Sequence, residues 1–485
     1  MSGYNEIYDV IVCGGGTSGV AAAISAARAG AEKVLLIEKT GSLGGQMSVS
    51  GPPGFAYARL FNCFGERDVG GFLYETHDRL YKAGHALPHL RPQHRVKGAY
   101  TFSYVDPEWW TLLMFDMMEE NNVTMLLDTL VVGALKDGNV ITGVTVEAVD
   151  GRHDIKGKII IDSTGEAFVS TYAGCETECV SRDEMQPHTV SFTADGVDWD
   201  KVLEYINRNP EQFTYKQLMN PATDNSQEEV FDAYRKMQDI RMMGEVMGFF
   251  QLRDMALANG DWHPYSGAGF FLMPKEGGKI LAHFQHSSQV DHCLPTDAWD
   301  VTRCHIECRK QIQIAWRFFK NYVPGFENAY IVRLCNEIRF REGPRIIGDY
   351  RMLVDDVKAV RQFKDTIGKS SFPAGAYHVA TVDTLNSIAG SEERVAPGGS
   401  YDIPYRCLVP QKIDNLLAAG KCVSADRASY LRYVQQTMVT GQAAGVAAAL
   451  CANKGITPRE LEKDVSELQK ILLDQGAILY DTIPS

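Results

Sequence analysis

One stretch near the start of the chain constrains its fold more than any other feature. A short, nearly all-apolar run, Asp9–Cys13, leads directly into Gly14–Gly19, where only two of the six residues are not glycine. The alanine-rich run Val20–Ala29 follows, and a second apolar run, Lys33–Ile37, stops at Glu38. This order predicts a buried strand, a glycine turn, a helix and a second strand, which together make one βαβ unit.

The glycines are spaced as in dinucleotide-binding turns. Gly14 permits the tight turn out of the strand, Gly16 lets backbone N–H groups approach a pyrophosphate, and Gly19 lets helix and strand pack closely. The helix N-terminus offers unpaired amides to the phosphates. Glu38 is placed to accept hydrogen bonds from ribose hydroxyls, which argues against a 2′-phosphate. The motif therefore predicts FAD or NAD without separating them, and NADP is the least favoured.

The rest of the chain predicts an α/β fold with an insertion. After the first unit, the pattern predicts a helix from Pro107 through Glu120, a β-meander strand over 140–149 and a buried strand over 158–162. From 174 to 400 aromatic, Met and charged residues mix without βαβ alternation, and a strand pattern returns at Asn415–Ala419. We predict a Rossmann-type domain from residues 1–173 and 401–485, with an α+β substrate domain, 174–400, inserted. No second glycine fingerprint follows a strand in that insertion, which argues against a built-in NAD(P)H domain.

Charge and composition narrow the partners. The net charge of −13 argues against nucleic acid. The start of the chain has no basic region followed by an apolar run, and the most apolar stretch, Ala443–Ala452, is about half of what a bilayer span needs. We therefore expect a cytoplasmic protein that acts on a small-molecule substrate and binds neither nucleic acid nor a membrane. Whether it forms a homo-oligomer is left open. No metal site is predicted, because the histidines and cysteines lack a third ligand at suitable spacing.

Taken together, these motifs resemble the FAD-dependent oxidoreductase family of the glutathione-reductase-like flavoprotein fold. Within it, the chain is most similar to the branch grouped with xanthan lyases and heterodisulfide-reductase-type flavoproteins. The segments that carry the resemblance are Gly14–Gly19, Glu38–Lys39, Gly41–Gly45, Asp162–Glu166, Arg341–Tyr350, Tyr401–Arg406, Asn415–Gly420 and Gly441–Gly445.

The resemblance implies an extended FAD. Gly14–Ser18 would hold the pyrophosphate, Glu38 the ribose and Val131 the adenine, and Gly45–Met47 would line the isoalloxazine. The helix at Gly441–Gln442 would direct its N-terminus at the pyrimidine end of the ring. The full set of predicted cofactor-binding residues is Gly14, Gly16, Thr17, Ser18, Gly19, Glu38, Lys39, Gly45, Gln46, Met47, Val131, Thr164, Gly165, Gly420, Gly441 and Gln442.

Comparison with the family also predicts how the FAD is attached. Relatives with covalent FAD use a histidine in the loop after the second strand, and none stands between Glu38 and Cys63. We therefore predict non-covalent FAD.

Three residues are predicted to act on the substrate. Arg345 would bind an anionic or carbonyl group, with the neighbouring Arg341 more suited to a salt bridge. His378 is the proton-transfer candidate, because imidazole titrates near neutral pH. Arg432, just before the last flavin helix, is a third candidate.

The predicted reaction is hydride transfer between a small organic substrate and flavin N5, by a dehydrogenase, an oxidase or an ene-type reductase. The flavin would exchange its electrons with oxygen, a quinone, a carrier protein or transiently bound nicotinamide. The alternatives are a flavoprotein with a non-redox or RNA-modifying role and an NAD-dependent dehydrogenase without flavin.

Overall fold

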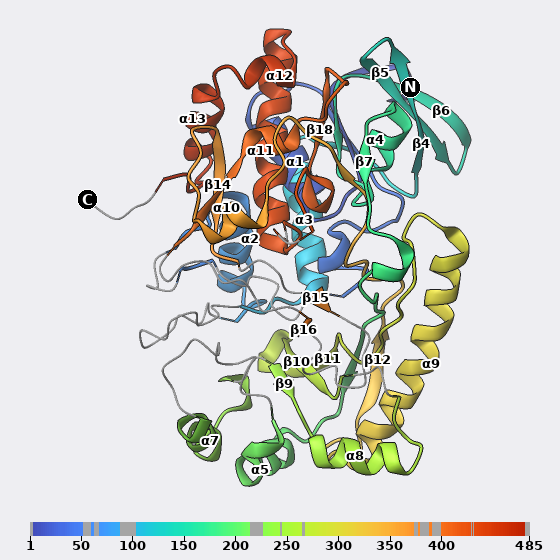
Figure 1. The fold of residues 1–485 in the computed structure, drawn as a ribbon, viewed down its shortest axis with the longest axis vertical. Coiled ribbons are helices and arrows are strands. Elements are labelled where there is room, and N and C mark those ends of the chain that lie inside the picture. The colour runs from blue at the N-terminus through green and yellow to red at the C-terminus, as the bar shows by residue number, and fades with distance from the viewer. Residues whose placement is uncertain are drawn as a thin grey trace.

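The protein consists of two halves stacked along its long axis (Figure 1). The structure is a computed structural model of the 485-residue chain. It describes residues 3–51, 60–62, 67–87, 103–213, 227–242, 245–263, 267–372, 377–378, 388–389, 399–427, 429 and 431–480.

A seven-stranded sheet organises the upper half. Its strands, in order across the sheet, are β3 (Thr124–Leu126), β2 (Val34–Ile37), β1 (Ile7–Cys13), β6 (Gly151–Asp162), β5 (Val140–Ala148) and β4 (Leu130–Asp137), and β18 (Leu416–Ala418) also pairs with β6. Strands β3, β2, β1, β6 and β18 run parallel, whereas β4, β5 and the first part of β6 form an antiparallel meander. All four residues of β2 are buried, as expected for a parallel strand covered on both faces. The mixed, parallel-rich sheet confirms the predicted α/β Rossmann-type fold.

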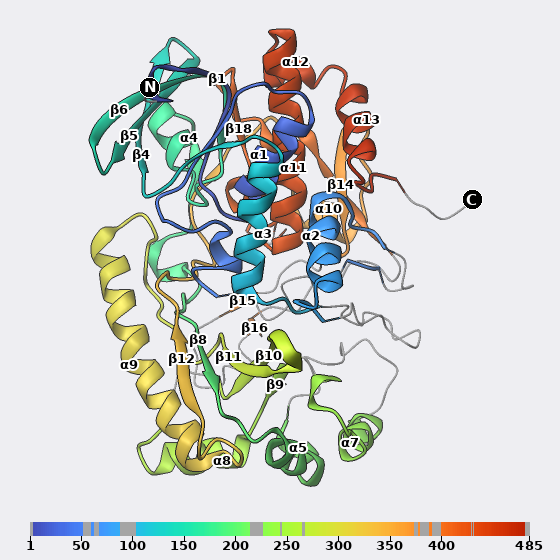
Figure 2. The same ribbon diagram turned by 180° about the vertical axis from the view of Figure 1, so that it is seen from behind.

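The upper half also contains helices, several of which contact the strands of this sheet. They are α1 (Thr17–Arg28), α2 (Gly71–Lys82), α3 (Pro107–Glu120), α4 (Phe168–Ala173), α10 (Val354–Lys358), α11 (Val434–Lys454), α12 (Pro458–Leu461) and α13 (Ser466–Asp474). Helix α3 spans the predicted residues because the Asp106 carboxylate caps it and a proline occupies its first position. Helices α1 and α11 lie side by side in both views (Figure 1 and Figure 2).

The close contact between α1 and α11 depends on two glycines. A Cβ at Gly441 would lie 2.2 Å from the carbonyl oxygen of Ser18, and one at Gly445 would lie 2.1 Å from that of Ala22. Any side chain at these positions would push the helices apart, so glycine is required for this packing.

A five-stranded antiparallel sheet organises the lower half. Its order is β12 (Tyr330–Leu334), β8 (Phe192–Asp195), β11 (Ile280–Phe284), β10 (Gly269–Pro274) and β9 (Glu245–Met247). The helices around it are α5 (Trp199–Arg208), α7 (Gln227–Arg235), α8 (Phe250–Ala258) and α9 (Ala298–Tyr322). An aromatic-rich core, from Val190 to Ile338, fills this half.

Three two-stranded pairs lie outside the two main sheets. They are β7 (Thr177–Glu178) with β13 (Arg345–Ile346), β14 (Thr366–Ser370) with β17 (Tyr401–Pro404), and β15 (Tyr377–His378) with β16 (Ile388–Ala389). Although Met352, Val357 and Ile367 fall within the predicted 174–400 insertion, they belong to the core of the upper half. The core of the lower half therefore covers a shorter part of the chain than the predicted insertion does.

Candidate cofactor and substrate site

Strand register brings the ends of the parallel strands to one edge of the sheet. Cys13 pairs with both Ile37 and Asp162, and Asp162 also pairs with Ala418. The chain segments that leave these strands therefore meet at the carboxyl edge, where α/β sheets bind their ligands. The glycine loop, Glu38 and the turn after β6 all begin there.

The glycine loop has the geometry that its spacing predicts. Gly14 has φ +104°, and a Cβ on it would lie 2.4 Å from the Ser163 carbonyl oxygen. A Cβ on Gly19 would lie 1.7 Å from the Gly14 carbonyl oxygen, so these two glycines are required by packing. At Gly16 a Cβ would meet nothing within 4 Å. Because Gly16 is also the N-cap of α1 and makes no side-chain cap bond, the first amides of α1 face open space.

Glu38 lies at the next strand end and binds the loop around it. One carboxylate oxygen accepts from the Gly15 N–H at 2.7 Å, and the other accepts from the Thr40 N–H at 3.0 Å and the Thr40 hydroxyl at 2.9 Å. Burial raises the pKa of this carboxyl, while the same hydrogen bonds act to lower it. The oxygen that accepts from Gly15 has a further lone pair, so Glu38 can still accept from a ligand hydroxyl.

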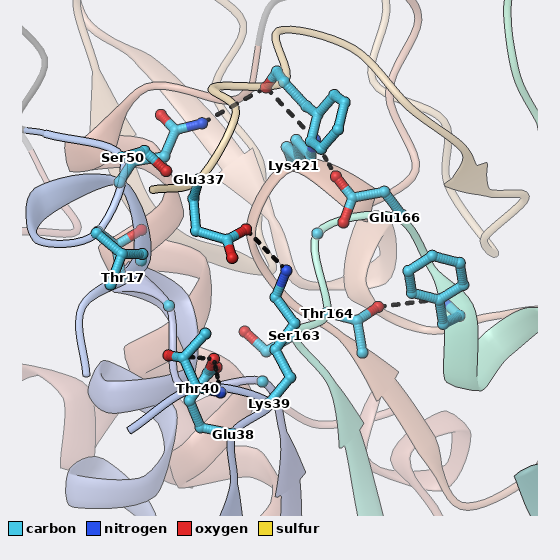
Figure 3. Close-up of a pocket in the computed structure, with 18 of the residues that line it drawn as sticks. Thr17, Glu38, Lys39, Thr40, Ser50, Ser163, Thr164, Glu166, Glu337 and Lys421 are labelled. Atoms are coloured by element: carbon cyan, nitrogen blue, oxygen red, sulfur yellow. Dashed lines mark hydrogen bonds and ion pairs between the residues drawn. The ribbon is translucent and has the colours of Figure 1, made fainter. Parts of the chain in front are cut away.

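A cavity runs along this edge and is lined from both halves (Figure 3). Eleven of the residues predicted from sequence to bind the cofactor or the substrate line this cavity. They are Gly14, Gly16, Thr17, Glu38, Lys39, Gly45, Gln46, Val131, Thr164, Gly165 and Arg432. The sequence did not single out the others, which are Ile37, Thr40, Val49, Ser50, Thr129, Leu130, Ser163, Glu166, Phe168, Glu337, Ile338, Phe340, Lys421, Val434 and Thr437. Their only sequence signal is proximity to a predicted motif, and Glu337–Phe340 lacks even that.

The segment 337–340 closes the cavity from the lower half. Lys39 pairs with Glu337 at 2.9 Å, and the Gln46 side-chain amide donates to the Phe340 carbonyl at 3.4 Å. A second ion pair joins Lys421 to Glu166 at 2.6 Å. Figure 3 shows both ion pairs across the opening. The cavity is therefore walled by the nucleotide-type loops on one side and by the end of the second core on the other.

Helix α11 begins at the cavity, directly after Arg432 and Tyr433. Its first residue is Val434, two turns before Gly441, and Val434 and Thr437 line the cavity. The Thr437 hydroxyl shares a hydrogen bond with the Thr17 hydroxyl at 2.7 Å, which joins the first turns of α11 and α1. The predicted residues Gly441 and Gln442 lie further along this helix and do not line the cavity.

Six of the predicted cofactor-binding residues lie behind the cavity wall. Ser18, Gly19, Gly420 and Gly441 meet where α1 packs on its neighbours, and a Cβ at Gly420 would lie 2.6 Å from the Ser18 hydroxyl oxygen. Met47 is fully buried in the core. The Gln442 side-chain carbonyl accepts from the Phe72 N–H at 3.1 Å, so it holds the start of α2. These positions shape the wall through packing.

The predicted substrate-binding arginines lie in different surroundings. Arg345 is 7% exposed, and its guanidinium donates to the Asp426 carbonyl at 2.6 Å and the Ala425 carbonyl at 3.4 Å. It does not line the cavity, because these carbonyls hold it within the β13 region. Arg432 does line the cavity, and it donates to the Arg341 carbonyl. Of these two arginines only Arg432 lines the cavity, and a role of either one in substrate binding stays a prediction.

Other predictions concern histidine, metals and membranes. The backbone of His378 forms half of β15, and its side chain lies outside the described residues. In the described ranges, no three His, Cys, Asp or Glu side chains come together in a way that could hold a metal ion. The described helices also include none that is long and apolar enough to cross a bilayer.

The cavity fits an extended dinucleotide. It offers the uncapped amides of α1 beside Gly16, a carboxylate at Glu38 and the first turn of a second helix at Val434. Fold and site thus define a dinucleotide-binding protein of the two-segment Rossmann class. The chain belongs to the FAD dependent oxidoreductase family, whose pattern it matches over residues 9–472, so it is an oxidoreductase with FAD as its cofactor. The family match does not show whether the chain belongs to the narrower branch that its sequence resembles. It gives no support to the alternative of an NAD-dependent dehydrogenase without flavin.

Solved structures with a similar fold are distant. A geranylgeranyl bacteriochlorophyll reductase-like protein from Thermoplasma acidophilum has 12% identity and a TM-score of 0.46, over 97% of this chain and 87% of that one. A p-nitrophenol 4-monooxygenase from Pseudomonas putida has 10% identity and a TM-score of 0.45, over 96% and 86%. L-proline dehydrogenase from P. horikoshii has 14% identity and a TM-score of 0.38, over 94% and 98%. At these scores they carry no argument about the site, and no protein with a curated description matches the sequence.

Proposed function

We propose that the protein transfers hydride between a small organic substrate and flavin N5, with the substrate held where the two halves meet. The observation that carries this proposal is a cavity lined by the glycine loop on one side and by Ile338, Phe340 and Arg432 on the other. When bound, FAD supplies the group that accepts or donates hydride. The protein supplies binding, orientation and electrostatics.

The nucleotide end of the cavity is suited to the phosphates and the ribose. The uncapped amides of α1 and its partial positive charge would hold the pyrophosphate beside Gly16. Glu38 would accept from ribose hydroxyls while keeping its bonds to Gly15 and Thr40. Backbone groups near Val131, at the start of β4, would contact the adenine.

The opposite end is suited to the ring and the substrate. Gly45 and Gln46 would lie along the isoalloxazine, and the first turn of α11 would favour negative charge that develops on the ring. Arg432 would contact the substrate, and His378 stays the proposed group that moves the paired proton. The ion pair Lys39–Glu337 would keep both walls together around the reacting groups, and Lys421–Glu166 would hold the turn after β6 against the segment after β18.

Anaerobic flavin bleaching tests this proposal. Purified protein would be mixed with small carboxylic acids, phenols and sugars, and the flavin band followed. We expect at least one compound to bleach it, and to do so more slowly when the reacting C–H is deuterated. The proposal fails if none does and if the dithionite-reduced protein is not reoxidised by the unsaturated counterparts of those compounds.

A further inference from the structure

One aromatic side chain of the lower half faces the cavity. Ile338 and Phe340, in the segment after β12, both line it, whereas Arg339 between them does not. This alternation is that of an extended segment, in which residues two apart point to the same side. The Arg339 N–H donates to the Thr189 carbonyl at 2.8 Å, as part of a short antiparallel bridge. The segment therefore presents two apolar side chains to the cavity.

The backbone around Phe340 is fixed on both sides. The N–H of the next residue, Arg341, donates to His188 Nδ1 at 3.1 Å. The Phe340 carbonyl accepts from Gln46 Nε2 and from Lys421 Nζ, each at 3.4 Å. Both of these donors belong to residues that line the cavity. The main chain of Phe340 is thus tied to the loop after β2 and to the segment after β18.

The ring of Phe340 is held as well. It meets the His188 ring in a T-shaped arrangement, with centroids 5.0 Å apart, and Lys421 Nζ lies 5.7 Å from its centroid. Burial, followed by the charge of Lys421, lowers the pKa of His188 to about 3, so the imidazole is neutral. Because its Nδ1 accepts from a backbone N–H, its Nε2 carries the hydrogen and donates to the Cys293 carbonyl at 3.0 Å. These bonds fix the imidazole against which Phe340 packs.

The surroundings of this ring indicate which part of FAD it would meet. Phe340 is only half-buried, and a phenyl ring that borders a cavity gains free energy when a flat apolar surface covers it. The two flat parts of FAD are adenine and the isoalloxazine. Adenine is assigned to the nucleotide end near Val131, whereas the bond to Gln46 places Phe340 beside the segment assigned to the isoalloxazine.

We propose that Phe340 packs its ring against the isoalloxazine, so that the lower half completes a cofactor site whose other parts come from the upper half. Ile338 extends the same apolar wall. The contact removes apolar surface from water and adds the offset or edge-to-face packing that aromatic pairs favour. This assignment rests on the placement of the flavin ring at Gly45 and Gln46 in the proposed function, but it does not depend on hydride transfer.

The test compares two ligands of the FAD-free full-length protein: FAD, and ADP, the half of FAD that lacks the flavin. Phe340→Ala removes the ring, and Phe340→Leu keeps an apolar side chain. Phe168→Ala is the matched control, because Phe168 also lines the cavity but lies on α4, which contacts β4 at the nucleotide end. Calorimetry would measure both dissociation constants, and the melting temperature would report folding.

Phe340→Ala should raise the dissociation constant for FAD at least about tenfold, because the flavin loses a ring that it covers. Phe340→Leu should raise it less, and both variants should bind ADP as the wild type does. Phe168→Ala should change the constants for FAD and ADP by the same factor. The visible absorption band of bound FAD, which reports the surroundings of the isoalloxazine, should shift in the Phe340 variants and not in Phe168→Ala.

The inference is overturned if Phe340→Ala binds FAD as the wild type does, or if its affinities for FAD and ADP fall together. Should Phe340→Ala fail to fold, the same two constants of Phe340→Leu decide the question. If the Phe340 variants behave as expected but no compound bleaches the flavin, the proposed hydride transfer fails and the contact stands. If a substrate bleaches the flavin and Phe340→Ala binds FAD normally, the function stands and the contact fails.

Discussion

The two ends of the cavity are built in different ways. The nucleotide end comes from one continuous βαβ unit, in which Gly14 to Glu38 are placed by strand register and glycine packing. The substrate end is assembled from Glu337, Ile338, Phe340 and Arg432, which come from distant parts of the chain. At the first end Gly15 and Thr40 hold the Glu38 carboxylate in place, whereas at the second end no single motif supplies the lining residues. The first end can therefore be recognised from one short stretch of sequence, and the second takes shape only in the folded chain.

The largest effect is expected from a variant at the nucleotide end that weakens FAD binding and leaves folding unchanged. Gly16→Val should raise the dissociation constant for FAD at least about 100-fold, or about 3 kcal/mol, because its side chain would occupy the open space where the phosphates approach. The ligand-free protein should keep its melting temperature, since nothing in the structure lies within 4 Å of that Cβ. Equilibrium dialysis and thermal melting measure the two effects.

Gly19→Ala is the matched control for that variant. Its Cβ would lie 1.7 Å from the Gly14 carbonyl oxygen, so the loop itself must shift. We expect a loss of about 3 kcal/mol in the free energy of unfolding even without FAD. Equal stability of the two ligand-free variants would show that the loop geometry described above is wrong.

The next effect concerns Glu38. Glu38→Ala should weaken FAD binding by about 1–3 kcal/mol through lost charge-assisted bonds. Thr40→Val removes only one hydroxyl donor to the same carboxylate and should cost less. Fluorescence titration of apoprotein with FAD gives both constants, and an unchanged constant for Glu38→Ala would mean that the ribose is held elsewhere.

A third variant sharpens the contrast between arginines. Arg345→Met should lower the free energy of unfolding by about 2 kcal/mol, because the Ala425 and Asp426 carbonyls lose their buried donor. Turnover should fall only in proportion to the folded protein. Denaturant unfolding and steady-state rates decide this, and a stable Arg345→Met that has lost turnover would return the substrate contact to Arg345.

The smallest effect is expected at the wall of the cavity. Glu337→Gln should change the free energy of unfolding by less than about 1 kcal/mol, because its partner Lys39 has a side chain that is 54% exposed. Glu166→Gln should cost more, since both members of its pair with Lys421 are 13% exposed. Urea melts compare the two, and the reverse order would contradict this account of the wall.

Prediction from sequence succeeded where structure is local. The turn, helix and strand from Asp9 to Glu38 follow from glycine spacing and apolar runs, and α3 follows from the Asp106 cap. For α11 the sequence indicated a helix after Arg432 but not how its first turns pack. Gln435 and Gln436 are 1% exposed, and Gln436 donates to the Tyr401 hydroxyl at 2.8 Å. Nothing in the sequence indicates that these polar residues are buried by tertiary packing.

The substrate end shows the limit more clearly. A conspicuous Arg-Glu-Gly-Pro-Arg motif, 341–345, drew attention to Arg345, but its side chain is bound to carbonyls outside the cavity. Ile338 and Phe340, which do line the cavity, precede the motif and have no local signal of their own. Which arginine faces a substrate depends on how β12 and the segment after it return to the upper half, and that is a property of the complete fold.

The central claim is that FAD is held reversibly in this cavity, and the flavin content of the purified protein tests it most directly. Its absorption spectrum would be recorded before and after acid precipitation, and the supernatant assayed for FAD. We predict one FAD per chain, all of it released into the supernatant, because the loop after Glu38 contains no histidine for covalent attachment. A colourless protein that takes up no FAD, or flavin that precipitates with the polypeptide, would contradict the claim.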